Sequence, residues 1–370
     1  LGSVEGVRLF FAPGRVNLIG EHTDYNGGYV FPAALSFGTY ALVKPRSDGM
    51  YRFRSMNFAQ QVDTHVDAIE YRKEDDWANY PKGVLAQLLA FVPSAESSSF
   101  TGADILYYGD IPNGAGLSSS ASIEMVTAYA LSQIAGITIP IIELVKLAQA
   151  AENQFVGVNC GIMDQFAVGM GKKDHALKLN CTDLSYEYAP LRLQGYKLIV
   201  TNTNKRRGLA DSKYNERRAE CEAGLHMLRE VKPDLPNLGA LSMEEWTSLR
   251  NAVKDPLIRN RVEHVVSEDQ RVLDAVQSLA ADDLTKFGQL MCESHGSLRG
   301  LYEVTGKELE ALQGAAMSVE GCLGSRMTGA GFGGCTVSLV REDAVDVFRR
   351  EVEQQYTVAT GLKPTFYVCD

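Results

Sequence analysis

Residues 112–122 read Pro-Asn-Gly-Ala-Gly-Leu-Ser-Ser-Ser-Ala-Ser, a glycine-rich loop that leads into a run of serines. The apolar residues at 103–108 predict a strand before this loop, and the spacing over 117–134 predicts a helix after it. Gly114 and Gly116 allow a tight turn that exposes backbone N–H groups. A helix N-terminus offers free N–H donors and partial positive charge, so the loop suits a phosphate group. An ordinary Gly-rich turn capped by serines remains the alternative.

Neither standard nucleotide fingerprint explains this loop. The sequence contains no GxxxxGK[ST] motif, which excludes the P-loop class. A literal GxGxxG occurs at Gly329, Gly331 and Gly334, but the apolar run 335–340 follows it and predicts a strand. The Rossmann fingerprint needs a strand before the glycines and a helix after them, so this match is discarded.

Outward from the loop, the first half of the chain mixes strands with helices, while the middle of the second half is nearly all helical. At about 150 residues per domain, 370 residues predict two domains, which we place at 1–185 and 186–370. The hydrophobic pattern predicts strands at 9–11, 39–43, 51–54, 103–108, 177–179, 197–201, 335–340 and 365–369. It predicts helices at 77–91, 117–134, 141–155, 212–231, 257–279, 306–319 and 343–355.

Composition limits the partners and the compartment. Lys+Arg 36 against Asp+Glu 46 gives a net charge of −10 and a pI near 5.2, which argues against nucleic acid or an anionic membrane as partner. The seven cysteines are scattered and show no CxxC or finger spacing, so we expect thiols in a reducing cytoplasm. The most apolar stretch, 134–151, contains Glu143 and Lys146, and no signal peptide is visible.

A polar loop lies near the start, at residues 14–28, GRVNLIGEHTDYNGG. Arg15, Glu21, His22 and Asp24 supply donors and acceptors that suit a ligand with many hydroxyl groups. An arginine also suits phosphoryl transfer, because it neutralises charge on the moving group. A solvated loop with Asn-Gly turn chemistry is the alternative, and His22 alone is more often a structural hydrogen bonder.

A third cluster is CGIMDQ at 160–165, preceded by Glu152 on the helix predicted to end near Phe155. Asp164 lies among apolar residues in the sequence, where a carboxyl group needs a hydrogen-bond or ion-pair partner or a functional role. A carboxylate beside a substrate hydroxyl can accept its proton during attack on phosphorus. The alternative is a buried aspartate that caps local structure.

Taken together, these segments resemble the galactokinase family of GHMP-superfamily small-molecule kinases. The resemblance spans nearly the whole chain in the family's order, with no departure at the motif positions, and rests on residues 14–28, 77–80, 114–122, 160–165, 214–221 and 325–335. It implies an α/β (α+β) two-domain GHMP kinase fold with the active site between the domains. The N-terminal domain would be ribosomal S5 domain 2-like and the C-terminal domain ferredoxin-like.

The resemblance also implies the reaction, in which ATP phosphorylates the C1 hydroxyl of α-D-galactose to galactose 1-phosphate in the Leloir pathway. By analogy, Asp164 is the catalytic base or orients the hydroxyl, and Arg15 stabilises the transferring phosphoryl and favours the ionised Asp164. Sugar contacts fall on Glu21, His22, Asp24, Gly161 and Tyr214, with Asp24 at the O3/O4 edge that distinguishes galactose from glucose. The resemblance implies that Ser120 and Glu152 bind Mg²⁺ and that Trp77 lies near the adenine ring. The residues implied to line the ATP phosphates are Gly114, Gly116, Ser118 and Ser119.

Two other functions stay open from the sequence. One is a sister kinase for N-acetylgalactosamine or arabinose, and the other is a catalytically silent galactose/ATP sensor that binds a regulator. A sensor could lose the phosphate serines or the acid, whereas Ser118, Glu152 and Asp164 are all present. The oligomeric state is not predicted. The basic run 205–207 is interpreted as a solvated surface feature.

Overall fold

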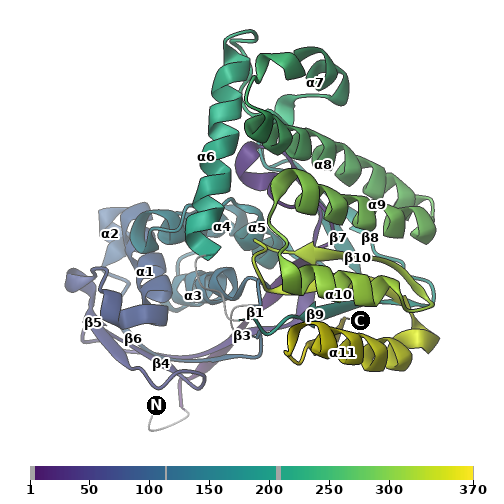
Figure 1. Cartoon of the computed structure of the whole chain (residues 1–370). Helices are drawn as coiled ribbons and strands as arrows, with labels where there is room; N and C mark the ends of the chain where they lie inside the picture. The colour runs from purple at the N-terminus through teal and green to yellow at the C-terminus, as the bar shows by residue number, and fades with distance from the viewer. Residues whose placement is uncertain (1–4, 113–114, 206–209, 370) are drawn as a thin grey trace. The chain divides into compact units, whose positions relative to one another are not determined.

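The computed structural model describes residues 5–112, 115–205 and 210–369 (Figure 1). The chain forms two compact units, each of which is described on its own. Of the described residues, unit 1 holds 5–15, 35–112 and 118–171, and unit 2 holds 16–34, 115–117, 172–205 and 210–369. The units are therefore interleaved along the chain, and the division at 185/186 stays a prediction about sequence domains.

Unit 1 contains a mixed sheet. Strand β3 pairs antiparallel with β6, β6 pairs parallel with β4, and β4 pairs antiparallel with β5. Along β4, Tyr51 and Phe53 are buried while Arg52 and Arg54 are partly exposed, which confirms the half-solvated strand predicted there. The bounds are β1 (Arg8–Asn17), β3 (Pro32–Pro45), β4 (Met50–Ser55), β5 (Val62–His65) and β6 (Ala103–Gly109). Strands β1 and β3 continue into residues of unit 2.

Helices complete unit 1. Helix α3 contacts α1, α4 and α5, and its first residue directly follows the serine loop. Helix α4 continues as a π-helical turn, Ala151–Val156, which ends at Gly157 in the left-handed conformation. The bounds are α1 (Asn79–Phe91), α2 (Ser94–Ser97), α3 (Ser119–Ala135), α4 (Ile141–Ala150) and α5 (Met163–Met170).

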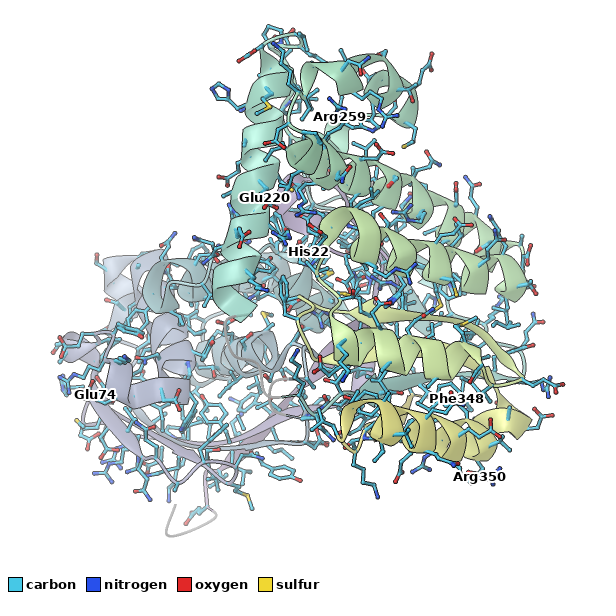
Figure 2. The ribbon with its side chains drawn as sticks, in the orientation of Figure 1. His22, Glu74, Glu220, Arg259, Phe348 and Arg350 are labelled. Carbon is cyan, nitrogen blue, oxygen red and sulfur yellow. The ribbon has the colours of Figure 1, made fainter. Side chains whose placement is uncertain are left out.

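Unit 2 contains a four-stranded antiparallel sheet with the order β10-β11-β9-β12. Its strands are β9 (Tyr196–Asn202), β10 (Cys322–Thr328), β11 (Cys335–Arg341) and β12 (Thr365–Cys369). Helices separate β9 from β10, and α11 (Val345–Thr360) separates β11 from β12. This βαββαβ order confirms the predicted ferredoxin-like arrangement. Figure 2 labels Phe348 and Arg350 on α11, of which Phe348 is fully buried and Arg350 exposed. Unit 2 also contains β2 (Tyr29–Val30), β7 (His175–Asn180) and β8 (Tyr186–Pro190), in which β7 pairs antiparallel with β2, with β8 and, at Ala33, with the start of β3.

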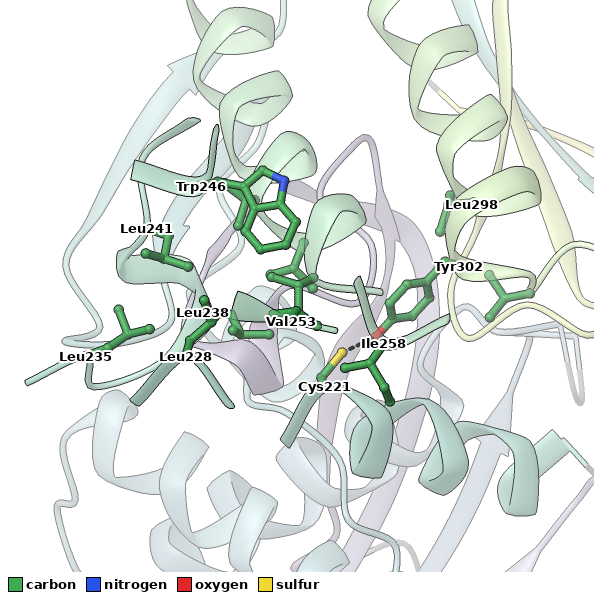
Figure 3. Close-up of a cluster of buried hydrophobic side chains, with 14 of the residues drawn as sticks. Cys221, Leu228, Leu235, Leu238, Leu241, Trp246, Val253, Ile258, Leu298 and Tyr302 are labelled. Atoms are coloured by element: carbon green, nitrogen blue, oxygen red, sulfur yellow. Dashed lines mark hydrogen bonds between the residues drawn. The ribbon is translucent and has the colours of Figure 1, made fainter. Parts of the chain in front are cut away.

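The segment between β9 and β10 is almost entirely helical and has its own core. Trp246 of α7 is 2% exposed and belongs to a buried cluster in which the Cys221 thiol contacts the Tyr302 hydroxyl (Figure 3). The bounds are α6 (Ala210–Arg229), α7 (Met243–Leu249), α8 (Pro256–Ala280), α9 (Leu284–Ser297) and α10 (Lys307–Met317). Among the described helices, none is both long enough and apolar enough to cross a membrane.

Candidate active site

Arg15 and Asp164 form an ion pair within unit 1. Arg15 Nη2 lies 2.6 Å from Asp164 Oδ1, and Arg15 Nε donates to the same oxygen at 2.9 Å. The arginine comes from β1 and the aspartate from the first turn of α5, so the fold joins two of the predicted motifs. The Arg15 side chain is 4% exposed, whereas that of Asp164 is 30% exposed. The carboxylate is therefore the accessible end of a charge-assisted pair, and not the buried local cap of the alternative interpretation.

Two further acidic side chains, Glu124 and Glu152, lie near this pair. Gln165 Nε2 donates to Glu152 Oε2 at 2.7 Å and to Glu124 Oε2 at 3.1 Å. Burial, together with the charge of Asp164, raises the pKa of Glu152 to about 7. Burial and the charge of Glu152 raise the pKa of Glu124 well above its usual value. Both shifts favour the protonated carboxyl groups, and the cluster is a place where a cation would relieve repulsion.

The serine loop presents a buried hydroxyl with no partner. Ser118 precedes α3 with φ +61°, and its Oγ neither caps the helix nor meets another hydrogen-bonding group within the described residues. Ser119 is exposed, and Ser120 hydrogen bonds to Glu152. Ser118 therefore does not cap the helix with its side chain, as the alternative interpretation of a serine-capped turn would require. Gly114 lies outside the described residues, and Gly116, which belongs to unit 2, has φ +76°.

Trp77 shares a cavity with two of these serines. The cavity lies within unit 1, has a volume of about 230 Å³ and is lined by Trp77, Ser119 and Ser120 among others. The indole is stacked on Phe58 at 6.1 Å between ring centroids, and its buried Nε1 has no partner in the part of the chain that the structure describes. An aromatic wall and serine hydroxyls in one cavity suit a ligand with a flat ring and phosphate groups.

Asp76, which also lines this cavity, has φ 43° and ψ −115°. A non-glycine residue rarely adopts this conformation, and such strain often accompanies function. The kink at Asp76 interrupts the 3₁₀ segment Lys73–Ala78 immediately before Trp77. The strained backbone therefore belongs to the wall of the cavity that holds the indole.

His22 lies in an aromatic cluster of unit 2. Its Nδ1 is 2.9 Å from the Tyr25 hydroxyl, and its ring centroid lies 5.6 Å from that of Tyr214 and 4.9 Å from that of Tyr302. Burial, aided by the charge of His264, lowers the pKa of His22 to about 3. The ring is therefore neutral at pH 7. Its buried Nε2 has no well-aligned hydrogen-bond partner among the described residues, although the backbone of Ala330 lies close enough to the ring to interact with it.

Tyr214 is held beside His22 by polar contacts of α6. Arg217 Nε donates to the Tyr302 carbonyl at 2.7 Å. Glu220, labelled on α6 in Figure 2, accepts from Arg217 at 3.1 Å and from Arg261 of α8 at 2.7 Å. These charged hydrogen bonds fix the helix that carries Tyr214.

Glu21 is engaged inside unit 2. The backbone N–H of Gly329 donates to Glu21 Oε1 at 2.7 Å, and Arg326 Nη1 lies 3.4 Å from the same oxygen. Arg326 is fully buried and also donates to the Asn17 carbonyl at 3.0 Å. Glu21 thus joins the polar loop to the C-terminal glycine-rich motif, a structural role that the sequence interpretation did not include.

The remaining predicted residues divide between the units. Asp24 begins a 3₁₀ turn of unit 2 and is partly exposed. Gly161 is buried in unit 1, three residues before Asp164. Of the basic run 205–207, Lys205 forms an ion pair with Glu308 at 2.7 Å, and the other two residues lie outside the described ranges.

Sequence reasoning missed Glu268, which supports the polar loop from α8. Glu268 Oε1 accepts from the backbone N–H of Gly20 at 3.0 Å and from Ser294 at 2.6 Å. Burial alone would raise the pKa of Glu268, but Arg271 and other nearby positive charge lower it to about 2. A single glutamate in a long amphipathic helix carries no motif, so only its tertiary contacts identify it.

Comparison with known proteins places this geometry in a family. Residues 79–172 match the N-terminal domain of GHMP kinases, and residues 275–358 match the GHMP kinase C-terminal region. The fold and the site therefore define a GHMP kinase, which confirms the predicted two-domain fold class. Residues 2–45 match the galactokinase galactose-binding signature. The chain belongs to the galactokinase family.

Individual relatives agree with this assignment. A galactokinase of Halalkalibacterium halodurans is 57% identical over 98% of this chain and 91% of its own, and one of Bacillus subtilis is 50% identical over 100% and 94%. The crystal structure of Lactococcus lactis galactokinase complexed with galactose has a TM-score of 0.95 and 42% identity, covering 100% of this chain and 95% of that one. Mevalonate kinase from Methanococcus jannaschii, at 18% identity and a TM-score of 0.70, shares the fold.

Proposed function

We propose that this protein transfers the γ-phosphoryl group of ATP to the C1 hydroxyl of α-D-galactose, which gives galactose 1-phosphate and ADP in the Leloir pathway. Identity of 57% to a galactokinase over nearly the whole chain supports the substrate, as does similarity to a galactokinase that binds galactose. The observation that carries the chemistry is the Arg15–Asp164 pair, in which an accessible carboxylate is held by a buried arginine at 2.6 Å.

In the proposed reaction, the C1 oxygen of the sugar attacks the γ-phosphorus while its proton passes to Asp164. The new C1–O–P linkage forms as the bond to the bridging oxygen breaks and ADP leaves. Loose phosphoryl-transfer transition states need little base strength, so Asp164 also serves by orienting the hydroxyl. Arg15 holds Asp164 in place, and its guanidinium neutralises charge on the transferring group.

The nucleotide part of the proposal rests on the cavity of unit 1. Trp77 would face the adenine ring, while Ser118 and Ser119 at the start of α3 would bind phosphate oxygens together with the backbone N–H groups there. The unpartnered Ser118 hydroxyl supports this role, because a buried hydroxyl without a partner is costly until a ligand satisfies it. Gly114 and Gly116 would let the backbone approach the phosphates.

Mg²⁺ fits the residues proposed for it. The Ser120 hydroxyl and the Glu152 carboxylate are hydrogen bonded to each other and supply the oxygen ligands that Mg²⁺ prefers. No group of three or more His, Cys, Asp and Glu side chains within the described ranges could hold a metal ion. Two protein ligands are compatible with Mg²⁺, which usually binds through one or two carboxylates plus substrate phosphates and water. The cation would neutralise phosphate charge.

The sugar part of the proposal assigns contacts to Glu21, His22, Asp24, Gly161 and Tyr214. His22 and Tyr214 lie in one aromatic cluster, and the buried Nε2 of His22, which has no well-aligned partner among the described residues, would hydrogen bond to a hydroxyl group of the sugar. Asp24 would pair with the O3/O4 edge, where the axial hydroxyl distinguishes galactose from glucose. Glu21 contributes by fixing the loop through Gly329 and can offer its second carboxylate oxygen.

A coupled ADP-release assay with galactose, N-acetylgalactosamine and arabinose tests the proposal. We expect the highest kcat/KM with galactose. Preference for another of these sugars would indicate a sister kinase, and tight galactose binding without ADP release would indicate a silent sensor. Repeating the assay with and without EDTA, with MgCl₂ added back, tests the requirement for Mg²⁺. We also propose that the enzyme acts in the cytoplasm, since no disulfide joins any of the seven cysteines, all of which lie in the described ranges.

A further inference from the structure

Three sulfur atoms meet in unit 2 where two helices reach the edge strand of the four-stranded sheet. Cys292 lies on α9, Met317 ends α10 and Cys322 begins β10. The Cys292 thiol donates to Met317 Sδ at 3.6 Å, and Cys322 Sγ lies 3.9 Å from the same atom. None of the three side chains belongs to the proposed sugar, nucleotide or magnesium site.

A close crossing of α9 over β10 brings the two thiols to this point. A Cβ atom at Gly324 would lie 2.2 Å from the Gly288 carbonyl oxygen, so the helix and the strand touch through their glycines. Cys292 follows Gly288 by four residues and therefore lies on the same face of α9. On the strand, a bulge between Cys322 and Gly324 changes the local direction of the backbone, as bulges do where a side chain must be re-aimed.

Sulfur side chains also pack as ordinary apolar groups, and a core contact would need no further explanation. The exposure of this group argues against such a contact. Met317 is 38% exposed, and both cysteines are partly exposed. Two thiols that both lie beside the same thioether, at a position that solvent reaches, form a donor set that an ion can reach.

The donor set and its spacing select the class of ion. Thiolate and thioether are soft ligands that favour Cu(I) over hard cations such as Mg²⁺. With metal–sulfur bonds of about 2.3 Å, three sulfurs around one ion in a plane would lie about 4 Å apart. The two distances to Met317 Sδ, 3.6 and 3.9 Å, are close to that spacing before any rearrangement.

We propose that Cys292, Met317 and Cys322 bind a soft monovalent cation of the Cu(I) type. Two S–H bonds break on binding, two metal–thiolate bonds and one metal–thioether bond form, and two protons pass to solvent. The ion arrives as Cu(I), so no electron is transferred. The bound ion would tie α9, α10 and β10 together.

Competition between the full-length protein and bicinchoninate for Cu(I), under anaerobic conditions, tests this site. We expect wild type to remove one equivalent of Cu(I) from the bicinchoninate complex. The Cys292→Ser and Cys322→Ser variants should not remove this equivalent, and Cys369→Ser should behave as wild type. X-ray absorption of the one-equivalent complex should show three sulfur neighbours. Unchanged thermal midpoints and galactose phosphorylation in the serine variants would show that they remain folded.

Met317→Leu separates a three-sulfur site from a two-thiol site, since leucine keeps the volume and removes the thioether. We expect its Cu(I) affinity to fall by at least about tenfold, because losing even a residue that only supports a metal ligand costs about 10- to 100-fold in affinity. Wild-type affinity in Met317→Leu would overturn the three-sulfur site. Equal Cu(I) uptake by wild type and the Cys292→Ser/Cys322→Ser double variant would overturn the proposal altogether.

Discussion

Arg15 directs both Nε and Nη2 at a single oxygen of Asp164, Oδ1, at 2.9 and 2.6 Å. The arginine is the buried partner, and the aspartate is the accessible one. This asymmetry leaves Oδ2 to other partners while Oδ1 is held in place. A carboxylate with one fixed oxygen and one approachable oxygen suits a group that must orient and accept from a substrate hydroxyl.

Asp164→Asn keeps the shape of the side chain and removes its charge. We expect kcat to fall by about 10²- to 10⁴-fold, the usual contribution of a general base, while the dissociation constant for galactose changes much less. ADP release gives kcat, and calorimetric titration gives the galactose affinity. Asp67→Asn, at a side chain that is 86% exposed, serves as the control. Unchanged turnover in Asp164→Asn would remove Asp164 from the mechanism.

Asp24→Ala tests how the sugar is distinguished from its epimers. A charged acceptor that pairs with an axial hydroxyl contributes about 1.5–3 kcal/mol, which corresponds to roughly 10- to 150-fold in kcat/KM for galactose. We expect activity with glucose to change less, so the ratio of kcat/KM for galactose to that for glucose should fall. The control is Asp183→Ala, at an exposed turn. An equal loss for both sugars would indicate a structural role for Asp24.

Regular elements with strong periodicity could be predicted from the sequence, and weakly patterned ones could not. Helix α8 and strands β9, β11 and β12 lie within one residue of their predicted limits. Helix α9 was missed because Gly288 and Gly296 break its pattern, although Gly288 is required by the contact with Gly324. Strand β10 was missed because five consecutive residues, 324–328, are buried and leave no alternation.

The same distinction applies to the site. The motifs supplied Arg15 and Asp164, and the structure shows that they meet. Glu124 lies two residues after the serine motif in the sequence, but nothing in that position signals its contact with Gln165. Partners that act through tertiary contact carry no local pattern, so sequence reasoning finds the residues of a motif and misses the side chains that hold them.

The two tryptophans allow a direct test of the nucleotide cavity. Trp246 is buried in the helical core of unit 2, so Trp246→Phe leaves Trp77 as the sole indole reporter. We expect ATP to change the fluorescence of Trp246→Phe with a saturable dependence on concentration. Trp77→Phe, which keeps an aromatic ring in the wall, should show no such change. It should also raise the KM for ATP by roughly 5- to 10-fold, because base–aromatic stacking weakens without vanishing.

Galactose supplies the specificity control for this experiment. The KM for galactose should stay near wild type in both variants, since neither tryptophan is among the proposed sugar contacts. If ATP leaves the emission of Trp77 unaltered while the enzyme turns over normally, the adenine ring binds elsewhere.

Glu152→Gln should make the protein more stable at alkaline pH. The fold raises the pKa of Glu152 from 4.5 to about 7, so between these values the folded protein holds a proton that the unfolded chain has released. Stability therefore falls as pH rises through this window, and a shift of this size corresponds to about 3 kcal/mol. Glutamine can still accept a hydrogen bond from Gln165 and has no proton to lose. The free energy of unfolding of Glu152→Gln should therefore increase relative to that of wild type between pH 4.5 and pH 8. Urea unfolding without nucleotide or divalent cation measures the difference in free energy of unfolding, with Glu96→Gln on the exposed surface as the control.

A difference in free energy of unfolding that does not depend on pH would mean that the carboxyl group of Glu152 is not held in its protonated form. Because Mg²⁺ with ATP would favour the ionised carboxylate, adding both should stabilise wild type more than Glu152→Gln and narrow the gap at pH 8.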